Sequence, residues 1–191
     1  HLGIARQSAS GIELRVHPTL IPERSLIAGV SDVSNAIMVN ADAVGTTLFY
    51  GPGAGAEPTA SAVIADIVDV ARVMDSYPDS WVPPLGCHSS VLQERALMAI
   101  EDVETGFYIR FSALDKPGVL SDITKIMGDA GISIEAIIQR EQPAGERYVN
   151  VIILTNVTKQ KCLNEAVMHI ENLETVRGQV SFIRVEYLDQ V

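Results

Sequence analysis

Hydrophobic and polar positions follow regular periods along much of the chain, most clearly after Thr105. Alternation with a period of two is typical of half-buried strands. It predicts strands at Phe107–Ala113, Ile132–Arg140, Tyr148–Thr155 and Phe182–Tyr187. Between these strands, apolar residues recur at helical spacing and predict two helices. The resulting order is βαββαβ, which is the ferredoxin-like arrangement.

The two helices each have one apolar face and recognisable ends. The first starts after Gly118 and stops at Gly131, with an apolar face of Val119, Leu120, Ile123, Ile126 and Met127. We expect Thr158 to cap the second, whose inner face is formed by Leu163, Ala166, Val167, Ile170 and Leu173. A module of this size has a marginal core. We therefore expect its sheet edge or face to pair with a second copy.

The pattern in the N-terminal part of the chain predicts fewer strands. Ile12–Leu20 alternates as a half-buried strand, and Pro18 limits it to an edge or marks its end. Asn35–Val39 and Thr46–Tyr50 predict a hairpin, because the residues between them are typical of turns. These strands are too few to form a self-contained α/β domain, since a parallel sheet needs further crossover units.

A glycine-rich stretch, Gly51–Gly55, joins the hairpin to a helix expected over residues 58–74. Pro58 suits the first helical position, where the missing amide hydrogen costs nothing. The apolar face of this helix is formed by Val63, Ile67, Val70, Ala71 and Met74. A strand, a glycine loop and a helix N-terminus can bring backbone amides to an anion or to the polar edge of a cofactor. The alternative interpretation, a plain turn, is the commoner one for such stretches.

Three prolines between Asp75 and Pro84, with serines and aspartates among them, mark a linker. The predicted division is a first part at 1–76, a linker at 77–104 and a second module at 105–191. Trp81, the only tryptophan, is expected to pack across a domain seam. The chain opens on His1–Ala5, which resembles the middle of an element, and we expect it to begin inside a larger domain.

Composition narrows the class of protein. The chain is 47% apolar and 20% charged, as in an ordinary globular protein. Its 14 basic and 24 acidic side chains give a net charge of −10, which argues against binding to nucleic acid or to anionic membranes. Cys87 and Cys162 lie far apart without a partner motif, so we expect neither disulfides nor a cysteine-based zinc site. A reducing, cytoplasmic setting follows.

The turn Asp115–Leu120 is a candidate ligand site. Free amides at the helix start could hold a carboxylate, while Asp115 could meet an ammonium group, and a zwitterionic amino acid supplies both. The equally weighted alternative is that Asp115 caps the helix and Gly118 makes the turn. Elsewhere no catalytic constellation is complete. His17 has no partner at ligand spacing, no G-x-G-x-x-G occurs, and no lysine precedes Lys116.

Two groups of residues resemble one family. Leu48–Ile67, which contains the glycine loop, and Arg15–Pro22 are similar to homoserine dehydrogenases. Asp115–Leu120 and Gly131–Glu135 resemble the ACT domain that many bacterial members carry at their C-terminus. The resemblance implies an α+β chain: a partial mixed sheet with a helix returning to the nucleotide domain, followed by a ferredoxin-like ACT domain.

That resemblance implies an enzyme that interconverts L-homoserine and L-aspartate 4-semialdehyde with NAD(P)H, on the route to threonine, methionine and isoleucine. In the family, the Rossmann domain and the catalytic lysine precede the segment seen here. We therefore expect no catalytic residue in these 191 residues and no dehydrogenase activity from them alone. The cofactor-facing residues would be Gly53, Ala54 and Gly55, with Gly55 near the nicotinamide.

For the ACT domain, the resemblance implies an amino-acid effector, most plausibly L-threonine as feedback inhibitor. The effector site would comprise Asp115, Lys116, Gly118, Val119 and Leu120. A homo-oligomer is expected through the sheet and the ACT domain, with no metal. The alternatives are an ACT module that binds another amino acid without any catalytic role, or one that only dimerises.

Overall fold

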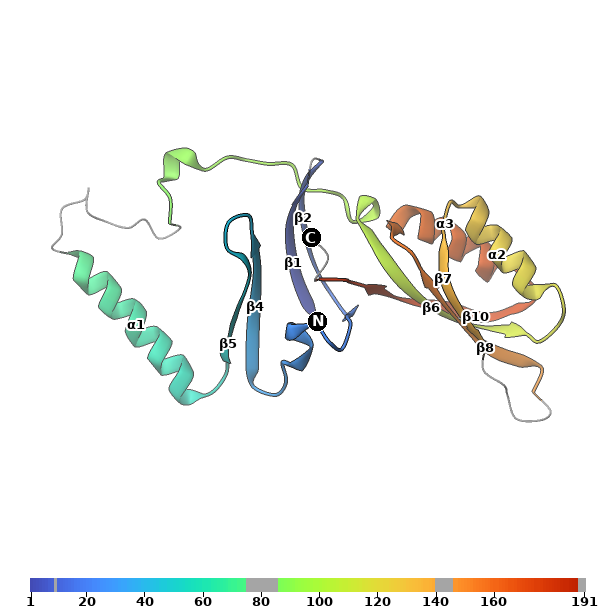
Figure 1. Cartoon of the computed structure of the whole chain (residues 1–191), viewed down its shortest axis with the longest axis horizontal. Coiled ribbons are helices and arrows are strands. Elements are labelled where there is room, and N and C mark those ends of the chain that lie inside the picture. The colour runs from blue at the N-terminus through green and yellow to red at the C-terminus, as the bar shows by residue number, and fades with distance from the viewer. Residues whose placement is uncertain (9, 75–85, 140–145, 189–191) are drawn as a thin grey trace. The chain divides into compact units, whose positions relative to one another are not determined.

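The computed structural model describes residues 1–8, 10–74, 86–139 and 146–188 (Figure 1). Its contacts divide the chain into two compact units, one of His1–Pro22 with Arg95–Val191 and one of Glu23–Glu94. The predicted linker at 75–84 with Trp81, and most of the expected loop at 142–146, fall outside the described residues. The domain boundaries drawn from the sequence stay a prediction.

The first unit contains the predicted βαββαβ module. Its elements are β6 (Glu104–Leu114), α2 (Val119–Asp129), β7 (Ile134–Gln139), β8 (Tyr148–Thr155), α3 (Gln160–Glu171) and β10 (Val176–Val185). The strands lie in the order β10-β6-β8-β7, and all three pairings are antiparallel. Both helices lie on the same side of this sheet (Figure 1). The predicted α+β, ferredoxin-like fold is confirmed.

The core lies between the sheet and the two helices. Phe107, Ile109 and Phe111 of β6 are buried, as their alternation with polar residues predicts. The helices contribute Val119, Ile123 and Met127 from α2 and Leu163, Ala166 and Ile170 from α3. These helix residues recur at three- and four-residue spacing, so each helix turns one apolar stripe toward the sheet.

Two sequence predictions in this module are wrong in detail. Thr158 does not cap α3, because Thr158–Lys159 form a two-residue strand, β9, that pairs with the start of β6. Lys159 occupies the N-cap position, without a side-chain cap hydrogen bond. The last strand begins at Val176 and not at Phe182. An irregularity between Arg177 and Ser181 breaks its alternation, and Gly178 there has a φ of +77°.

The same unit includes a hairpin from the start of the chain. β1 (Leu2–Ser8), which the sequence analysis did not predict, pairs antiparallel with β2 (Gly11–His17). Pro18 ends β2, as expected, and β3 (Thr19–Leu20) then pairs in parallel with the end of β10. The backbone amide of Glu186 also donates to the carbonyl of Leu20, at 2.9 Å. β3 is thus a fifth strand of the ferredoxin-like sheet, next to β10.

The second unit contains the predicted hairpin and helix. β4 (Ser34–Ala41) and β5 (Gly45–Pro52) pair antiparallel, and α1 spans Ala56–Met74. The helix begins two residues before the predicted start, so Pro58 is its third residue. An amide there still has no intrahelical acceptor, and proline is therefore tolerated. None of the described residues buries a side chain of α1.

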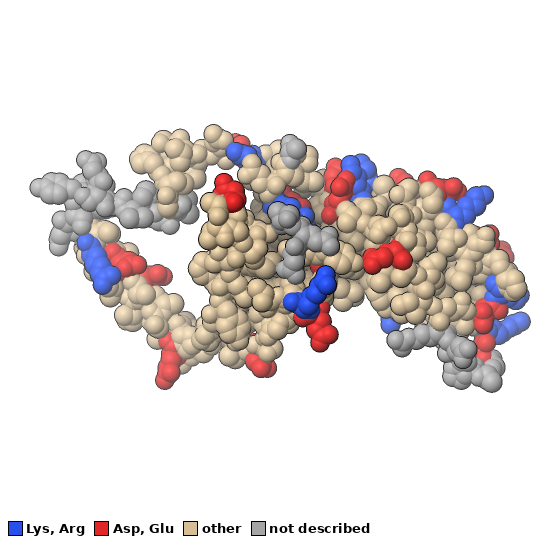
Figure 2. All heavy atoms as spheres, viewed as in Figure 1, with Lys and Arg blue, Asp and Glu red and all other residues tan. Residues whose placement is uncertain are grey.

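Three short 3₁₀ turns complete the described elements: η1 (Leu26–Gly29), η3 (Ser89–Val91) and η4 (Ile100–Asp102). Acidic and basic side chains are interspersed over the α2 and α3 region on the face shown in Figure 2, where no continuous basic patch forms. None of the described helices combines the length and the apolar character needed to span a bilayer.

Replacing Ile123 by alanine tests the core. Ile123 is fully buried, and truncating such a side chain costs about 2–5 kcal/mol of unfolding free energy, because a cavity is left behind. Ile138→Ala on β7 is the matched control, since Ile138 is 45% exposed and its truncation leaves no enclosed cavity. Urea unfolding followed by circular dichroism measures both. Equal losses in the two variants would contradict this placement of the core.

Candidate functional site

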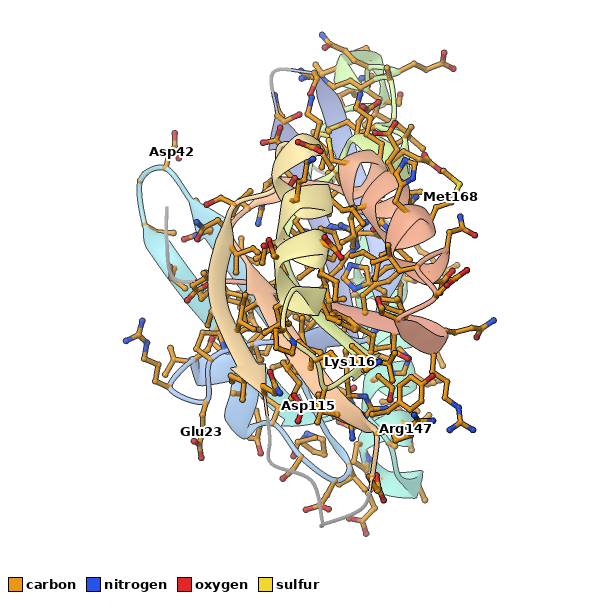
Figure 3. The ribbon with its side chains drawn as sticks, turned by 90° about the vertical axis from the view of Figure 1, so that its right-hand side faces the viewer. Glu23, Asp42, Asp115, Lys116, Arg147 and Met168 are labelled. Atoms are coloured by element: carbon orange, nitrogen blue, oxygen red, sulfur yellow. The ribbon has the colours of Figure 1, made fainter. Side chains whose placement is uncertain are left out.

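A pocket of about 150 Å³ lies at the turn between β6 and α2. All five predicted effector residues line it: Asp115, Lys116, Gly118, Val119 and Leu120. Figure 3 shows Asp115 and Lys116 at the end of β6, with Arg147 nearby at the start of β8. The backbone amide of Asp115 donates to the carbonyl of Arg147 at 3.1 Å, which fixes this end of the turn.

The start of α2 leaves backbone donors available at this pocket. Gly118 is the N-cap residue, with a φ of +95°, and no side chain caps the helix. The interpretation of Asp115 as the helix cap is therefore wrong. Its carboxylate oxygen Oδ1 instead accepts a hydrogen bond from Nε2 of Gln139, at 3.1 Å. The first amides of a helix have no intrahelical acceptor, and the helix dipole is positive there.

The pocket combines polar and apolar walls. Ala113, Val149 and Val151 are buried apolar lining residues, while Asp115, Lys116 and Gln139 supply polar groups. An apolar cavity of this volume is large enough to hold benzene. The start of α2 offers donors to an anionic group, and the carboxylate of Asp115 offers an acceptor to a cationic one.

The glycine loop of the second unit has a different character. Gly53, Ala54 and Gly55 are all exposed, so the backbone of the loop is open to approach. Gly55 has a φ of +124°, and its carbonyl accepts from the amide of Thr59 at 3.2 Å as α1 begins. A Cβ on Gly53 would fall 1.8 Å from Nδ2 of Asn35, so a side chain there displaces Asn35. The loop contains no titratable group.

Sequence reasoning missed a buried ionic cluster on β2. The strand alternates as predicted, but its buried face carries Glu13 and Arg15, while Leu14 and Val16 are exposed. Arg15 pairs through Nε with Glu13, and its Nη1 lies 2.6 Å from Oε1 of Glu186, which follows β10. The sequence does show charged residues at alternate positions of this strand, which could have indicated a charged face. It does not show that the distant Glu186 is their partner.

His17 and two further arginines adjoin this cluster. Nη1 of Arg15 lies 2.7 Å from Nε2 of His17, so that nitrogen acts as acceptor and the proton sits on Nδ1. Arg6 approaches Glu186 at 3.7 Å. Burial, followed by the nearby charge of Arg15, lowers the pKa of Arg184, and Glu186 and Glu13 act against this. Within the described residues, no His, Cys, Asp or Glu side chains group in a way that could hold a metal ion.

The fold and the pocket define a small α+β module with a candidate ligand pocket. Comparison with known proteins gives this module its family. Residues 1–68 match the family described as homoserine dehydrogenase, and residues 107–172 match the ACT domain. The chain belongs to the homoserine dehydrogenase family and corresponds to the C-terminal portion of its members.

Similar proteins support this assignment over nearly the whole chain. The homoserine dehydrogenase of Pseudomonas aeruginosa is 49% identical over 189 residues, which is 99% of this chain and 44% of that protein. The enzyme of Neisseria gonorrhoeae is 43% identical over 190 residues, or 98% and 43%. A solved homoserine dehydrogenase from Thiobacillus denitrificans superimposes with a TM-score of 0.88 and 50% identity, covering 97% of this chain and 42% of that one. The chain thus spans less than half of these relatives.

Glycine-to-alanine substitutions at the two ends of α2 test the backbone geometry of the pocket. Gly118→Ala is expected to lower the unfolding free energy by about 1–2 kcal/mol, because an L-residue is strained at a φ of +95°. Gly128→Ala, inside the helix with free space around its Cβ, is expected to raise it by roughly 0.5–1 kcal/mol. Thermal or urea unfolding measures both, and a stabilised Gly118→Ala variant would refute the left-handed N-cap.

Proposed function

We propose that this chain is part of an NAD(P)-dependent homoserine dehydrogenase that interconverts L-homoserine and L-aspartate 4-semialdehyde in the cytoplasm. The reaction belongs to threonine, methionine and isoleucine biosynthesis. The observation that carries the proposal is the 49% identity to a homoserine dehydrogenase over 99% of this chain. The chain's own contribution would be scaffold, a cofactor-facing loop and the ACT module.

The loop Gly53–Gly55 would face the nicotinamide cofactor. The cofactor supplies the hydride, and the protein must bind and orient it. The loop suits an approach by a ligand edge, because its backbone is exposed and Gly53 carries no side chain that would cover it. These residues would position the cofactor only in part, since the 191 residues contain no dinucleotide-binding glycine motif.

The ACT module would bind an amino acid, L-threonine, as feedback effector in the pocket at the β6–α2 turn. Free amides at the start of α2 would hold the carboxylate, and Asp115 would accept from the ammonium group. The apolar walls would contact the side chain. Gln139 would support the site from β7, because it already holds Asp115. This hydrogen bond holds the side chain of Asp115 in place, which favours a site that is formed before the ligand binds.

A second candidate function is association with another copy through the ACT sheet. β7 is the outermost strand of the described sheet, and its Ile137 and Ile138 are 39% and 45% exposed. An exposed apolar edge strand is a template for pairing with a further strand. A homo-oligomer formed there is compatible with effector binding, and it is the whole role of the module if no amino acid binds.

Calorimetric titration of the chain with L-threonine tests the effector proposal. We expect binding that L-serine and L-lysine do not match. Asp115→Asn is expected to weaken it by roughly tenfold or more, because a hydrogen bond between charged groups is lost. Asp122→Asn is the matched control, since Asp122 lies in the first turn of α2 but does not line the pocket. If no amino acid gives binding heat, the effector proposal is wrong and association with another copy is the remaining function proposed for the module.

The 191-residue chain is expected to show no dehydrogenase activity by itself. No lysine precedes Lys116, so the N-terminal part has no lysine general acid or base, and no dinucleotide cradle is present. NADPH absorbance measured with L-aspartate 4-semialdehyde tests this. The full-length enzyme from Pseudomonas aeruginosa, in the same assay, serves as positive control. Turnover by the pure chain would show that catalytic groups lie within these residues.

A further inference from the structure

A second pocket, of about 380 Å³, lies in the first unit, away from the β6–α2 turn. Its lining comes from β2, η4, the start of α3 and the end of β10, and includes Arg15, Glu101, Gln160, Asn164 and Arg184. Its volume falls within the range of small-molecule sites. None of its lining residues also lines the pocket at the β6–α2 turn, so the two sites can be tested separately.

The lining of this pocket includes the buried guanidinium of Arg184, which has no carboxylate at ion-pair distance among the described residues and feels the charges of Glu186 and Glu13 only from further away. Arg184 is 6% exposed and donates only to neutral acceptors, Oγ1 of Thr105 at 3.0 Å and the carbonyl of Ile100 at 3.4 Å. Its guanidinium also lies 5.3 Å from the ring centroid of Phe107. A buried cation normally has an anionic partner, because its desolvation is costly. Among the described residues, no carboxylate pairs with Arg184.

Arg15 adds a second guanidinium beside the first. Its side chain is 1% exposed, and its Nη2 is buried with no hydrogen-bond partner among the described residues. The carboxylates nearby are Glu13 and Glu186, which also serve Arg6. Arg6 and Arg15 therefore take up both carboxylates, and Arg184 is the third arginine beside them without an ion pair among the described residues. Glu101, the acidic residue in the pocket lining, is exposed at its rim.

The start of α3 supplies donors to the same pocket. This helix has 12 residues, begins at Gln160 and has no side-chain cap. The backbone amide of Gln160 donates to the carbonyl of Val103 at 3.1 Å, so this helix start contributes the positive end of its dipole to the pocket and not that amide. Nε2 of Gln160 donates to Oδ1 of Asn164 at 2.8 Å, which leaves the amide group of Asn164 as a donor at the exposed side. Arginines, a helix start and side-chain amides are the groups that bind oxyanions.

We propose that this pocket binds a small oxyanion, the phosphate or carboxylate group of a metabolite, with Arg184 as its principal charge partner. Such an anion balances the surplus positive charge of the arginine cluster. It also contacts β10 and β2 together, the two strands that Arg15 and Glu186 already join. The site is separate from the proposed threonine pocket, and its occupancy does not depend on that proposal.

Binding is measured by calorimetry and by thermal shift on the 191-residue chain, with inorganic phosphate and with succinate as probes and chloride at matched ionic strength as baseline. Asn164→Asp adds a negative charge at the exposed side of the pocket, yet its carboxylate still accepts from Gln160, so the fold is retained. We expect it to weaken binding by about tenfold or more. Arg184→Gln is expected to do the same, through loss of a charged donor.

Arg177→Gln is the matched control, because Arg177 is exposed on the same strand, outside the pocket, and its loss changes the net charge equally. Phosphate binding without succinate binding assigns the site to phosphate, and the reverse assigns it to a carboxylate. Binding of both supports a general oxyanion site. No binding above the chloride baseline overturns the proposal. Binding that Asn164→Asp and Arg184→Gln leave unchanged overturns it as well.

Discussion

The burial of β6 is the constraint on which the first unit depends. This strand pairs with β10 and β8 along its length and with β9 at its start. Its inward side chains, among them Phe107 and Ile109, are covered completely by α2 and α3. Because β6 cannot shift without exposing these side chains, the turn that follows it is held in place. That turn forms most of the lining of the pocket between β6 and α2, so the same packing that stabilises the module also positions its candidate site.

Much of this fold could be predicted because its information is local. The alternation in β6 and β8 and the helical spacing in α2 and α3 each lie within one short segment, so period alone identified them. The errors arose where a distant partner overrides local preference. Thr158 has a suitable side chain for a cap, but its backbone pairs with β6. β2 alternates as a strand, yet its charged residues lie on its buried face. They can do so because Glu186, about 170 residues further along the chain, pairs with Arg15.

The two candidate sites differ in the same way. The turn from Asp115 to Leu120 could be predicted, because one continuous stretch supplies most of the pocket. Its support from Gln139 could not, since that contact joins β7 to the turn after β6, and β8 lies between the two strands. The second pocket, lined by Arg15 and Arg184, could not be predicted from the sequence. Arg15, Gln160 and Arg184 lie far apart along the chain, and no sequence motif links the three. Only the fold brings them to one surface.

The compact units do not follow the family boundaries, because backbone pairing and an ionic cluster join the N-terminal hairpin to the ACT region. The homoserine dehydrogenase match runs through residue 68, whereas contacts group the first 22 residues with the ACT region. Several links join these segments: β3 pairs in parallel with β10, Ile12 exchanges backbone hydrogen bonds with Ala96 and Met98, and Arg15 forms a buried ion pair with Glu186. Removing one partner of a buried ion pair costs far more than an exposed pair gains, because the other charge is left in a dry site. The hairpin β1–β2 is therefore anchored to β10 by charge as well as by backbone pairing.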